Sequence, residues 1–327
     1  MRTSRGTVSV LVSICLCLGM ASAPAAGAAT TVEHIAGNFV GDARVEIFEY
    51  RPGTGADFLF TDFSKASGSV TFTTNSFRVT GTYTPFSGDF DGDGQDELFW
   101  YGGGDNADHL WKFSGVTNVT QYEIPQGSLY FPVPGDFDGD GADEILWYAP
   151  GTVPDEIWDF APGDVTRHTV HPITITGDYV PLSGNFTGDG GEDVILYGRG
   201  TTADHLFDFD PGSLTPTRLP FGPITGTDHQ PFTLDTRNDG WTDIFFYQPG
   251  TPTDPYWDFT PANGILKTLE RVDGTYDPAA GDLFGDGHDD VFWFGTNSSI
   301  WDWELTPTGL TVTHRPFGVA TSAAPAG

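Results

Sequence analysis

The stretch Gly88–Tyr101, GDFDGDGQDELFWY, decides the fold of this 327-residue chain because versions of it recur along the whole sequence. Six copies begin 47 to 51 residues apart, at Gly37, Gly88, Gly135, Gly184, Leu234 and Gly281. A fixed period of this length is typical of repeat architectures in which each copy forms one supersecondary unit. The copies fill nearly all of the chain after residue 28 and leave no room for a separate catalytic domain.

Each copy has the pattern of short strands. The block ends in a run that is apolar on both faces, such as Leu98–Tyr101, as expected of a strand with sheets stacked on either side. A Gly/Pro-rich turn leads to a strand with alternating aromatics, such as Glu156–Phe160, then to a Thr-rich strand, such as Arg167–Val170. A further strand, such as Tyr179–Leu182, leads into the next block. Four antiparallel strands in each unit of about 48 residues predict a β-propeller blade.

The sequence therefore predicts an all-β fold, a six-bladed β-propeller of four-stranded antiparallel blades, over residues 29–318. The segment Val32–Ala36 matches the strand that leads into each acidic loop, and the last copy ends with a Thr-rich strand near Thr311–His314, so the two ends complete a ring. A linear solenoid or a pair of sandwiches would leave strand edges exposed, and the chain has no capping segment to cover them. Residues 319–327 are expected to form a flexible tail.

Residues 1–28 have the organisation of a secretory signal peptide. A basic head contains Arg2 and Arg5, Val8–Met20 is apolar, and Ala26–Ala28 provides small residues for cleavage. The apolar run is shorter than the roughly 20 residues that span a bilayer. We therefore expect a secreted, extracellular protein.

Both cysteines of the chain, Cys15 and Cys17, lie inside this segment, so the mature protein is expected to contain none. An exported domain without disulfides needs another source of stability, and bound metal ions can supply it.

The composition restricts the choice of partners. The chain has 14 Lys+Arg against 45 Asp+Glu, a net charge of −31, so phosphate backbones and anionic lipids would repel it. Binding of nucleic acid and docking to a membrane through basic residues are therefore excluded, and cations or neutral molecules are favoured. Only 18% of residues are charged and 14% are aromatic, with 43 Gly and 24 Pro, which disfavours both disorder and long helices.

The recurring block also contains a loop that suits a metal ion. We number its residues 1 to 9 from the residue after the first glycine, so that position 1 of the second copy is Asp89. Acidic residues at positions 1, 3, 5 and 9 cluster oxygen ligands, glycines at 4 and 6 permit a tight curl, and the carbonyl at position 7 adds a ligand of the kind calcium accepts. The predicted ligands of the second and third copies are Asp89, Asp91, Asp93, Gln95 and Glu97, and Asp136, Asp138, Asp140, Ala142 and Glu144.

The loop is not an EF-hand. Trp100 and Trp147 stand at position 12, where an EF-hand requires an acidic ligand, and strand-type runs flank the loop in place of helices.

This pattern resembles the FG-GAP/VCBS repeat of integrin α-subunit propellers and of many secreted bacterial propeller proteins. The spacing Asp-x-Asp-x-Asp-Gly-x-x-Asp/Glu recurs in register with the strand pattern, and the resemblance covers all six copies. It implies that the matched positions coordinate calcium at the bottom of the blades. Glutamate at position 9 in the first three copies, where the family usually has aspartate, is a departure that lengthens the ligand.

The remaining loops keep fewer acidic residues. The fourth and sixth loops retain enough oxygen ligands for a site, and the first is the weakest. We expect at least two calcium ions and up to four. The residues concerned are Asn185, Thr187, Asp189 and Asp193 in the fourth loop, Asp282, Asp286 and Asp290 around Phe284 in the sixth, and Asn38, Val40, Asp42 and Glu46 in the first.

The fifth loop carries Arg237 at position 3, between Asp235, Asp239 and Asp243. Our hypothesis is that its guanidinium replaces the cation by neutralising these carboxylates. For all six loops, the alternative is a metal-free Asp/Gly turn closed by hydrogen bonds from backbone to side chain.

The hairpins on the opposite face repeat a different aspartate. The interpretation we favour is that it closes the hairpin, and the alternative is a ring of polar acceptors in a sugar-binding surface. His109 and His205 follow it at equivalent places, and a set of tryptophans at equivalent strand positions predicts packing between blades. The aspartates are Asp57, Asp108, Asp155, Asp204 and Asp254, and the tryptophans are Trp111, Trp158, Trp257 and Trp301.

The sequence contains no recognisable catalytic motif: it lacks a Gly-x-Ser-x-Gly elbow, a His-Glu-x-x-His pair and a glycine-rich phosphate loop. His168 and His171 form the densest histidine pair, but their spacing alone is weak evidence for a site. We therefore predict a monomeric binding module for an extracellular glycan or protein. Two alternatives stay open, a polysaccharide lyase or hydrolase acting on the hairpin face and a structural spacer without a defined ligand.

Overall fold

The structure is a computed structural model that describes residues 32–316, apart from residues 67–68, 105, 152, 199–200, 225–228, 252, 261–263, 296–299 and 307–308. The predicted signal peptide, residues 1–28, and the predicted tail, residues 319–327, lie outside the described residues. Within the described part, no helix has the length and apolar character that crossing a bilayer requires.

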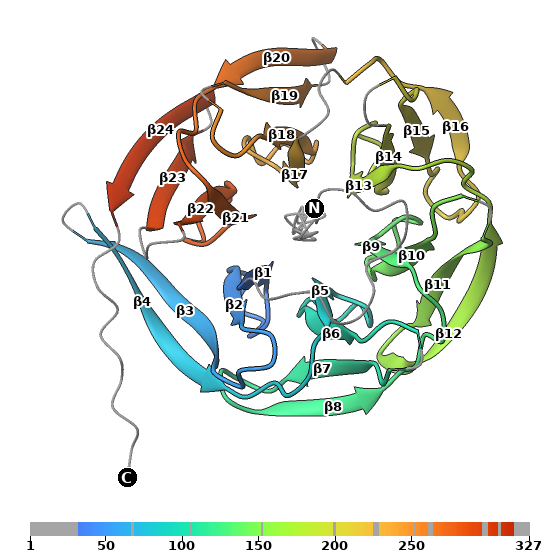
Figure 1. The fold of residues 1–327 in the computed structure, drawn as a ribbon, viewed down its shortest axis with the longest axis horizontal. Coiled ribbons are helices and arrows are strands. Elements are labelled where there is room, and N and C mark those ends of the chain that lie inside the picture. The colour runs from blue at the N-terminus through green and yellow to red at the C-terminus, as the bar shows by residue number, and fades with distance from the viewer. Residues whose placement is uncertain are drawn as a thin grey trace, which may run out of the picture.

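The described chain forms six four-stranded antiparallel sheets arranged as blades around a central axis (Figure 1). Each blade consists of four consecutive strands, so the predicted six-bladed propeller is confirmed. Blades 1 and 2 are β1 (Glu33–Gly37), β2 (Glu46–Tyr50), β3 (Asp57–Ala66) and β4 (Ser69–Phe77), and β5 (Thr84–Gly88), β6 (Glu97–Tyr101), β7 (His109–Phe113) and β8 (Val119–Glu123). Blades 3 and 4 are β9 (Phe131–Gly135), β10 (Glu144–Tyr148), β11 (Asp155–Ala161) and β12 (Asp164–Ile173), and β13 (Val180–Gly184), β14 (Asp193–Tyr197), β15 (His205–Asp208) and β16 (Thr217–Pro220). Blades 5 and 6 are β17 (Gln230–Leu234), β18 (Asp243–Tyr247), β19 (Asp254–Thr260) and β20 (Gly264–Glu270), and β21 (Tyr276–Gly281), β22 (Asp290–Gly295), β23 (Ile300–Thr306) and β24 (Gly309–Pro316).

The hydrophobic core lies between blades, where large aromatic side chains from facing sheets interdigitate. Trp147 of β10 is fully buried, and its ring lies 5.1 Å from that of Trp158 in its own blade and 5.9 Å from that of Phe86 in blade 2. Such edge-to-face pairs add to the hydrophobic gain of burying each ring. The second strand of each blade is buried on both faces for this reason, as its apolar run predicts.

Of the four tryptophans predicted to pack between blades, Trp111, Trp158 and Trp257 are all at least nine-tenths buried. In blade 6 the equivalent position belongs to Trp303 and not to Trp301 as predicted, although Trp301, partly buried, also packs against the core cluster of blades 5 and 6. Trp303 pairs with Val291 as Trp158 pairs with Ile145, and its ring lies 5.0 Å from that of Trp293. Trp301 and Trp303 lie two residues apart on one strand and therefore share a face, and the pairing of the strands assigns the equivalent position to Trp303.

Neighbouring blades are joined by the same backbone hydrogen bond at all six seams. The N–H of loop position 8 donates to the carbonyl of loop position 1 in the preceding blade, over 2.7 to 3.2 Å. The donors are Asp96, Asp143, Glu192, Thr242, Asp289 and, from blade 1 to blade 6, Val45.

At four seams the side chain of position 8 returns a second hydrogen bond. Asp143 Oδ2 accepts from the N–H of Asp89 over 3.0 Å, and Asp96 Oδ2 accepts from that of Asn38 over 2.8 Å. A Cβ on Gly88 would lie 2.8 Å from Asp143 Oδ2, so the seam between blades 2 and 3 has little room for a side chain at this glycine. We call this paired contact the latch; Thr242 and Asp289 complete it at two further seams.

On the opposite face, four tyrosines hold the linkers between blades. Tyr50 Oη donates to the carbonyl of Gly81 over 3.0 Å and accepts from the N–H of Tyr83 over 3.1 Å. Tyr101, Tyr148 and Tyr247 make the same two bonds to the linkers that follow their blades. Blade 6 has Phe294 at this position.

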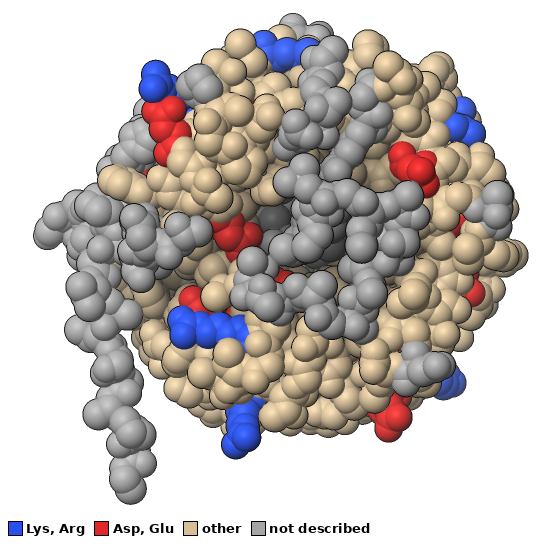
Figure 2. All heavy atoms as spheres, in the orientation of Figure 1, with Lys and Arg blue, Asp and Glu red and all other residues tan. Residues whose placement is uncertain are grey.

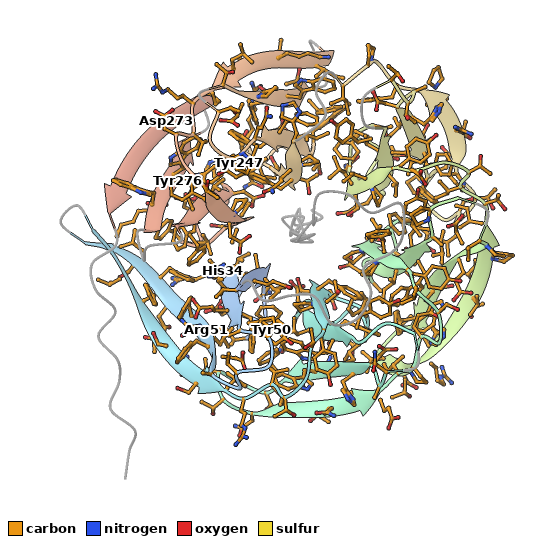
Figure 3. All side chains as sticks on the ribbon, in the orientation of Figure 1. His34, Tyr50, Arg51, Tyr247, Asp273 and Tyr276 are labelled. Carbon is orange, nitrogen blue, oxygen red and sulfur yellow. The ribbon has the colours of Figure 1, made fainter. Side chains whose placement is uncertain are left out.

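The ring closes where β1 lies beside β21 (Figure 1), as the matching of the two chain ends predicts. Val45 has no side-chain acceptor for a latch, and a different contact is found at this seam. His34, which Figure 3 labels beside the start of blade 1, stacks on Phe294 at 3.6 Å between ring centroids, and its Nδ1 lies 2.6 Å from Asp277 Oδ2 of β21. The ends are therefore joined by these side chains and by the backbone hydrogen bond from Val45 to Asp282, and not by a shared sheet.

We expect Asp96→Ala to lower the free energy of unfolding by about 1–3 kcal/mol, because it leaves a buried backbone N–H without its acceptor. Asp96→Asn keeps an acceptor oxygen and is expected to cost less. Urea unfolding of both variants tests this, and equal losses for alanine and asparagine would contradict the latch.

Candidate functional site

The acidic loops curl as the alternation of acid and glycine predicts. In blade 2, Asp89 accepts hydrogen bonds from the N–H groups of Asp93 and Gly94 over 2.9 and 2.7 Å, and Asp93 accepts from that of Gln95. Gly92 and Gly94 have φ of 71° and 89°, a region that side chains other than glycine rarely adopt. The metal-free turn that the sequence offers as an alternative is thus complete in its backbone, and the remaining carboxylate oxygens decide whether a cation is also needed.

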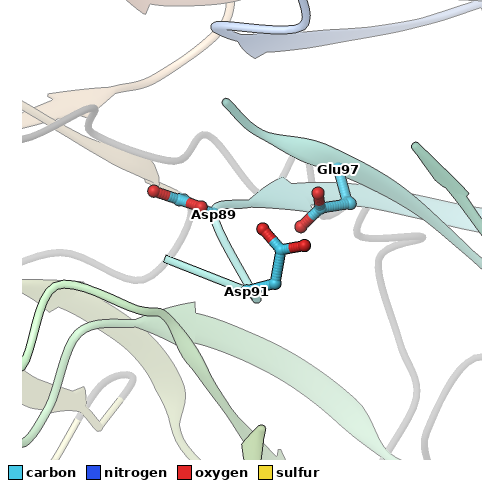
Figure 4. A group of neighbouring side chains, drawn as sticks. All are labelled: Asp89, Asp91 and Glu97. Atoms are coloured by element: carbon cyan, nitrogen blue, oxygen red, sulfur yellow. The ribbon is translucent and has the colours of Figure 1, made fainter. Parts of the chain in front are cut away.

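In three of the described loops, three carboxylates converge: one from position 1, one from position 3 or 5, and one from position 9. Each set has ligand atoms within 4.8 Å of one another, the spacing at which oxygens share one cation. These sets are Asp89, Asp91 and Glu97 in blade 2, shown in Figure 4, Asp136, Asp138 and Glu144 in blade 3, and Asp282, Asp286 and Asp290 in blade 6.

In blade 2 a lysine from the third strand enters the loop. Nζ of Lys112, on β7, lies 2.6 Å from Asp91 Oδ2, 2.9 Å from Asp93 Oδ2 and 2.9 Å from Glu97 Oε1. The hydrogen bonds to these carboxylates raise the pKa of Lys112, so it stays charged. The sequence prediction named Gln95 as a ligand through its backbone carbonyl, and its side-chain amide donates to the carbonyls of Phe39 and Phe113.

In blade 3 no lysine or arginine of the described chain forms an ion pair with the loop. Burial, together with the charges of its acidic neighbours, raises the pKa of Glu144 to about 10 and that of Asp136 to about 6. Oδ1 of Asp136 is buried without a hydrogen-bond partner, whereas Oε2 of Glu144 accepts from the N–H of Phe137 over 2.9 Å. These residues fit a divalent cation, because it would supply both the missing charge and the missing partner.

The loop of blade 6 also fits a cation. Asp290 is 1% exposed, and neither of its carboxylate oxygens has a hydrogen-bond partner. Lys65 of the neighbouring blade lies over the ring of Phe284, with Nζ 3.5 Å from Asp286 Oδ2. Burial is the largest cause of the raised pKa of Asp290, and the charge of Lys65 partly opposes it.

The fourth and first loops satisfy their position-9 acids with backbone groups. Asp193 accepts from the N–H groups of Phe186, Thr187 and Phe209 at 3.0 to 3.1 Å, and Glu46 accepts from that of Val40. Asn185 bonds the backbone of Gly188 and Gly240, and Asp189 bonds that of Gly191. The loops are therefore closed by hydrogen bonds, and their metal sites stay predictions.

In the fifth loop the guanidinium of Arg237 pairs with Asp258 of β19, a residue that the sequence analysis did not name. Asp243 instead accepts from Tyr256 Oη and Thr236 Oγ1 over 2.6 and 2.7 Å. Arg237 thus places a positive charge beside this loop, but its partner is Asp258 on the third strand and not the loop carboxylates that the hypothesis named.

The position-8 acids were also missed as a set. They line, with position 1, a cavity of about 830 Å³ between the loops, which includes Asp89, Asp136 and Glu192. Burial raises the pKa of Asp96 to about 7 and that of Asp143 and Glu192 well above the usual range. The recurrence of an acid at position 8 in four copies is the signal that could have revealed them.

The repeated hairpin aspartates are structural, as the favoured interpretation has it. Asp57, for example, accepts from the N–H of Arg51 in its own hairpin and of Val79 in the following linker, over 2.9 and 2.7 Å. All five are buried and make the same two bonds, so they are not open to a ligand: Asp57, Asp108, Asp155, Asp204 and Asp254.

The two equivalent histidines lie at seams, each against the tyrosine of the preceding linker. The rings of Tyr83 and His109 are 6.1 Å apart and those of Tyr179 and His205 are 6.0 Å apart, both edge to face, and all four side chains are partly exposed. We call these two pairs the Tyr–His stations.

Seen from the side of Figure 2, the described surface has few charged side chains.

The remaining histidine pair lies on the outer strand β12 and does not form a joint site. His168 stacks on Trp158 at 4.0 Å, and His171 Nε2 lies 3.2 Å from Asp159 Oδ2.

The chain is similar in fold to solved propellers of low sequence identity. An Agrocybe aegerita lectin, described by its specific recognition of non-reducing terminal N-acetylglucosamine, matches with a TM-score of 0.59 at 14% identity, over 88% of this chain and 80% of that one. The pore of the Photorhabdus luminescens Tc holotoxin matches with a TM-score of 0.56 at 15% identity, over 88% of this chain but only 14% of that one. At such identities the likeness shows a shared fold and no more.

No curated protein matches the sequence. The family model for an FG-GAP-like repeat matches residues 89–147, which run from the loop of blade 2 into the second strand of blade 3. This segment contains the two loops with the most acidic ligands and the strands between them. Residues 89–147 are therefore an FG-GAP-like repeat within a six-bladed β-propeller.

Proposed function

We propose that the protein is an extracellular binding module. Calcium stabilises it, and a glycan binds at the seams between blades, on the face formed by the hairpins. The observation that carries the calcium part is the loop of blade 3, where two half-buried carboxylates and the buried Glu144 converge without a lysine or arginine paired to them in the described chain. Asp136, Asp138 and Glu144 would hold the ion there, and Asp282, Asp286 and Asp290 would do so in blade 6. Calcium would supply charge neutralisation and cross-link each loop to the start of its second strand.

The glycan part rests on the Tyr–His stations. A sugar presents C–H groups to an aromatic face and hydroxyls to a neighbouring donor and acceptor, and a tyrosine beside a neutral imidazole offers both. Burial and the nearby charge of Arg218 lower the pKa of His205, which keeps its ring neutral. Gln121 receives a hydrogen bond from Trp111 and donates to Nδ1 of His109, which leaves Nε2 of the neutral ring as a donor. The lectin of similar fold is consistent with this proposal.

Removing a ligand of blade 3 is expected to remove one calcium ion per chain. Glu144→Gln keeps the shape of the side chain but lowers the charge available to the ion. Calorimetric titration of the chelated protein should show one fewer site than the unaltered chain, and calcium should raise the melting temperature less. Glu46→Gln, at position 9 of the first loop, is the matched control and should leave the count unchanged. A wild-type chain that melts at one temperature in EDTA and in millimolar calcium would end this part of the proposal.

The metal-free protein is expected to lose stability as pH rises. Because the pKa values of Asp136 and Glu144 are raised to about 6 and about 10, the folded state binds more protons than the unfolded chain above the ordinary pKa of these groups. In EDTA the melting temperature should therefore be higher near about pH 5 than near about pH 8. In calcium the decline should be smaller or reversed, since the ion binds the ionised carboxylates. A flat profile in EDTA would contradict the raised pKa values.

Glycan binding is tested on an array that includes chains ending in N-acetylglucosamine, with and without calcium. Replacing Tyr179 and His205 together with alanine should weaken binding, and also replacing Tyr83 and His109 should abolish it. His171→Ala, on the outer strand, is the control and should bind as before. Binding that survives loss of both stations would place the ligand elsewhere, and an array without signal would favour the spacer interpretation.

A further inference from the structure

One pair of positions differs in charge among the blades. The first is loop position 3, and the second is the residue that follows the packing tryptophan on the third strand. Trp111, Trp158 and Trp257 pair with the residue after loop position 9 in their blades, so the residues that follow them, Lys112, Asp159 and Asp258, occupy one position.

In blades 2 and 5 the pair is an ion pair of opposite polarity. In blade 2 the acid is on the loop and the base on the strand, with Lys112 Nζ 2.6 Å from Asp91 Oδ2. In blade 5 the base is on the loop and the acid on the strand, as Arg237 bonds Asp258. The same contact thus forms whichever side carries the positive charge, which shows that the two positions are within reach of each other.

In blade 3 both positions are acidic. Asp159 occupies the register position from which Lys112 and Asp258 reach loop position 3 in blades 2 and 5. Asp159 also faces His171. The Nε2 of His171 lies 3.2 Å from Asp159 Oδ2, and this imidazole is more than one-third exposed. A cation bound between Asp138 and Asp159 would neutralise these carboxylates in blade 3, as the ammonium of Lys112 neutralises Asp91 in blade 2.

We propose that this strand position selects the cation of its loop: Lys112 serves as a covalently attached cation that makes the second loop independent of calcium, and Asp159 serves as an additional calcium ligand in the third. The inference rests on the proposed calcium binding for its second half. The first half rests on Lys112 alone.

The contacts of Lys112 explain why calcium does not displace it. The ammonium makes three charge-assisted hydrogen bonds, to Asp91, Asp93 and Glu97, and thereby uses all three of its N–H donors. Its side chain is 24% exposed and Glu97 is fully buried, so removing the ammonium would leave a buried carboxylate without its counterion. Such a loss costs far more than the loss of a surface ion pair.

The test exchanges the two residues and counts ions by calorimetric titration of the chelated protein. Lys112→Asp should add one calcium ion per chain, and Asp159→Lys should remove one. In otherwise unaltered protein, Asp138→Asn should lower the count by one whereas Asp91→Asn, at the same loop position, should leave it unchanged. Lys267→Met, which removes an exposed lysine that lies over Trp257, is the matched control.

Each outcome decides the inference. If Asp91→Asn removes an ion, or Lys112→Asp adds none, Lys112 does not stand in for calcium and the inference is overturned. If the unaltered chain binds no calcium but Lys112→Asp binds one, the role of Lys112 stands and the proposed function fails. Should Lys112→Asp not fold, Lys112→Met takes its place, with the melting temperature in EDTA and in calcium as the readout: recovery by calcium supports the inference, and equal losses in both oppose it.

Discussion

The hydrogen bond from loop position 8 to loop position 1 of the preceding blade is the constraint on which the ring depends. It is made by backbone groups, so it tolerates the different residues at position 8, from Asp143 to Thr242 and Val45. It also fixes where each acidic loop lies, because positions 1 and 8 belong to the loops themselves. The placement of the acidic loops and the stacking of blades are therefore two consequences of one contact.

The latch and the loops place many carboxylates in surroundings that water reaches poorly. A buried carboxylate must be protonated, hydrogen-bonded or matched by a cation, and the six loops use all three solutions. Asp193 is bonded by backbone N–H groups, Glu97 faces Lys112, and Glu144 has its pKa raised to about 10. The repeat thus keeps one backbone shape while each copy balances its charge differently.

The sequence predicts the fold well because one period specifies strands, turns and loops in the same register six times. The apolar run of β10 and the glycines of the loops act locally, so they can be recognised without coordinates. The candidate site is predicted less completely. Lys112 lies 21 residues from Asp91 and Asp258 lies 21 from Arg237, each on another strand, and only the pairing of strands brings them together. The place of Trp303 was missed for a related reason, since Trp301 and Trp303 share one face of β23 and only the strand pairing tells which of them is equivalent to Trp158.

Every blade is built from consecutive strands, and none combines the two ends of the chain. Duplication or deletion of one repeat in the gene would therefore add or remove a whole sheet, and no strand would lose its pairing partner. The number of blades in such a protein is then limited by the wedge shape that each interface allows around the axis, and not by the connectivity of the chain. Lineages of this architecture can change ring size in single genetic events, with only the closing interface to be rebuilt.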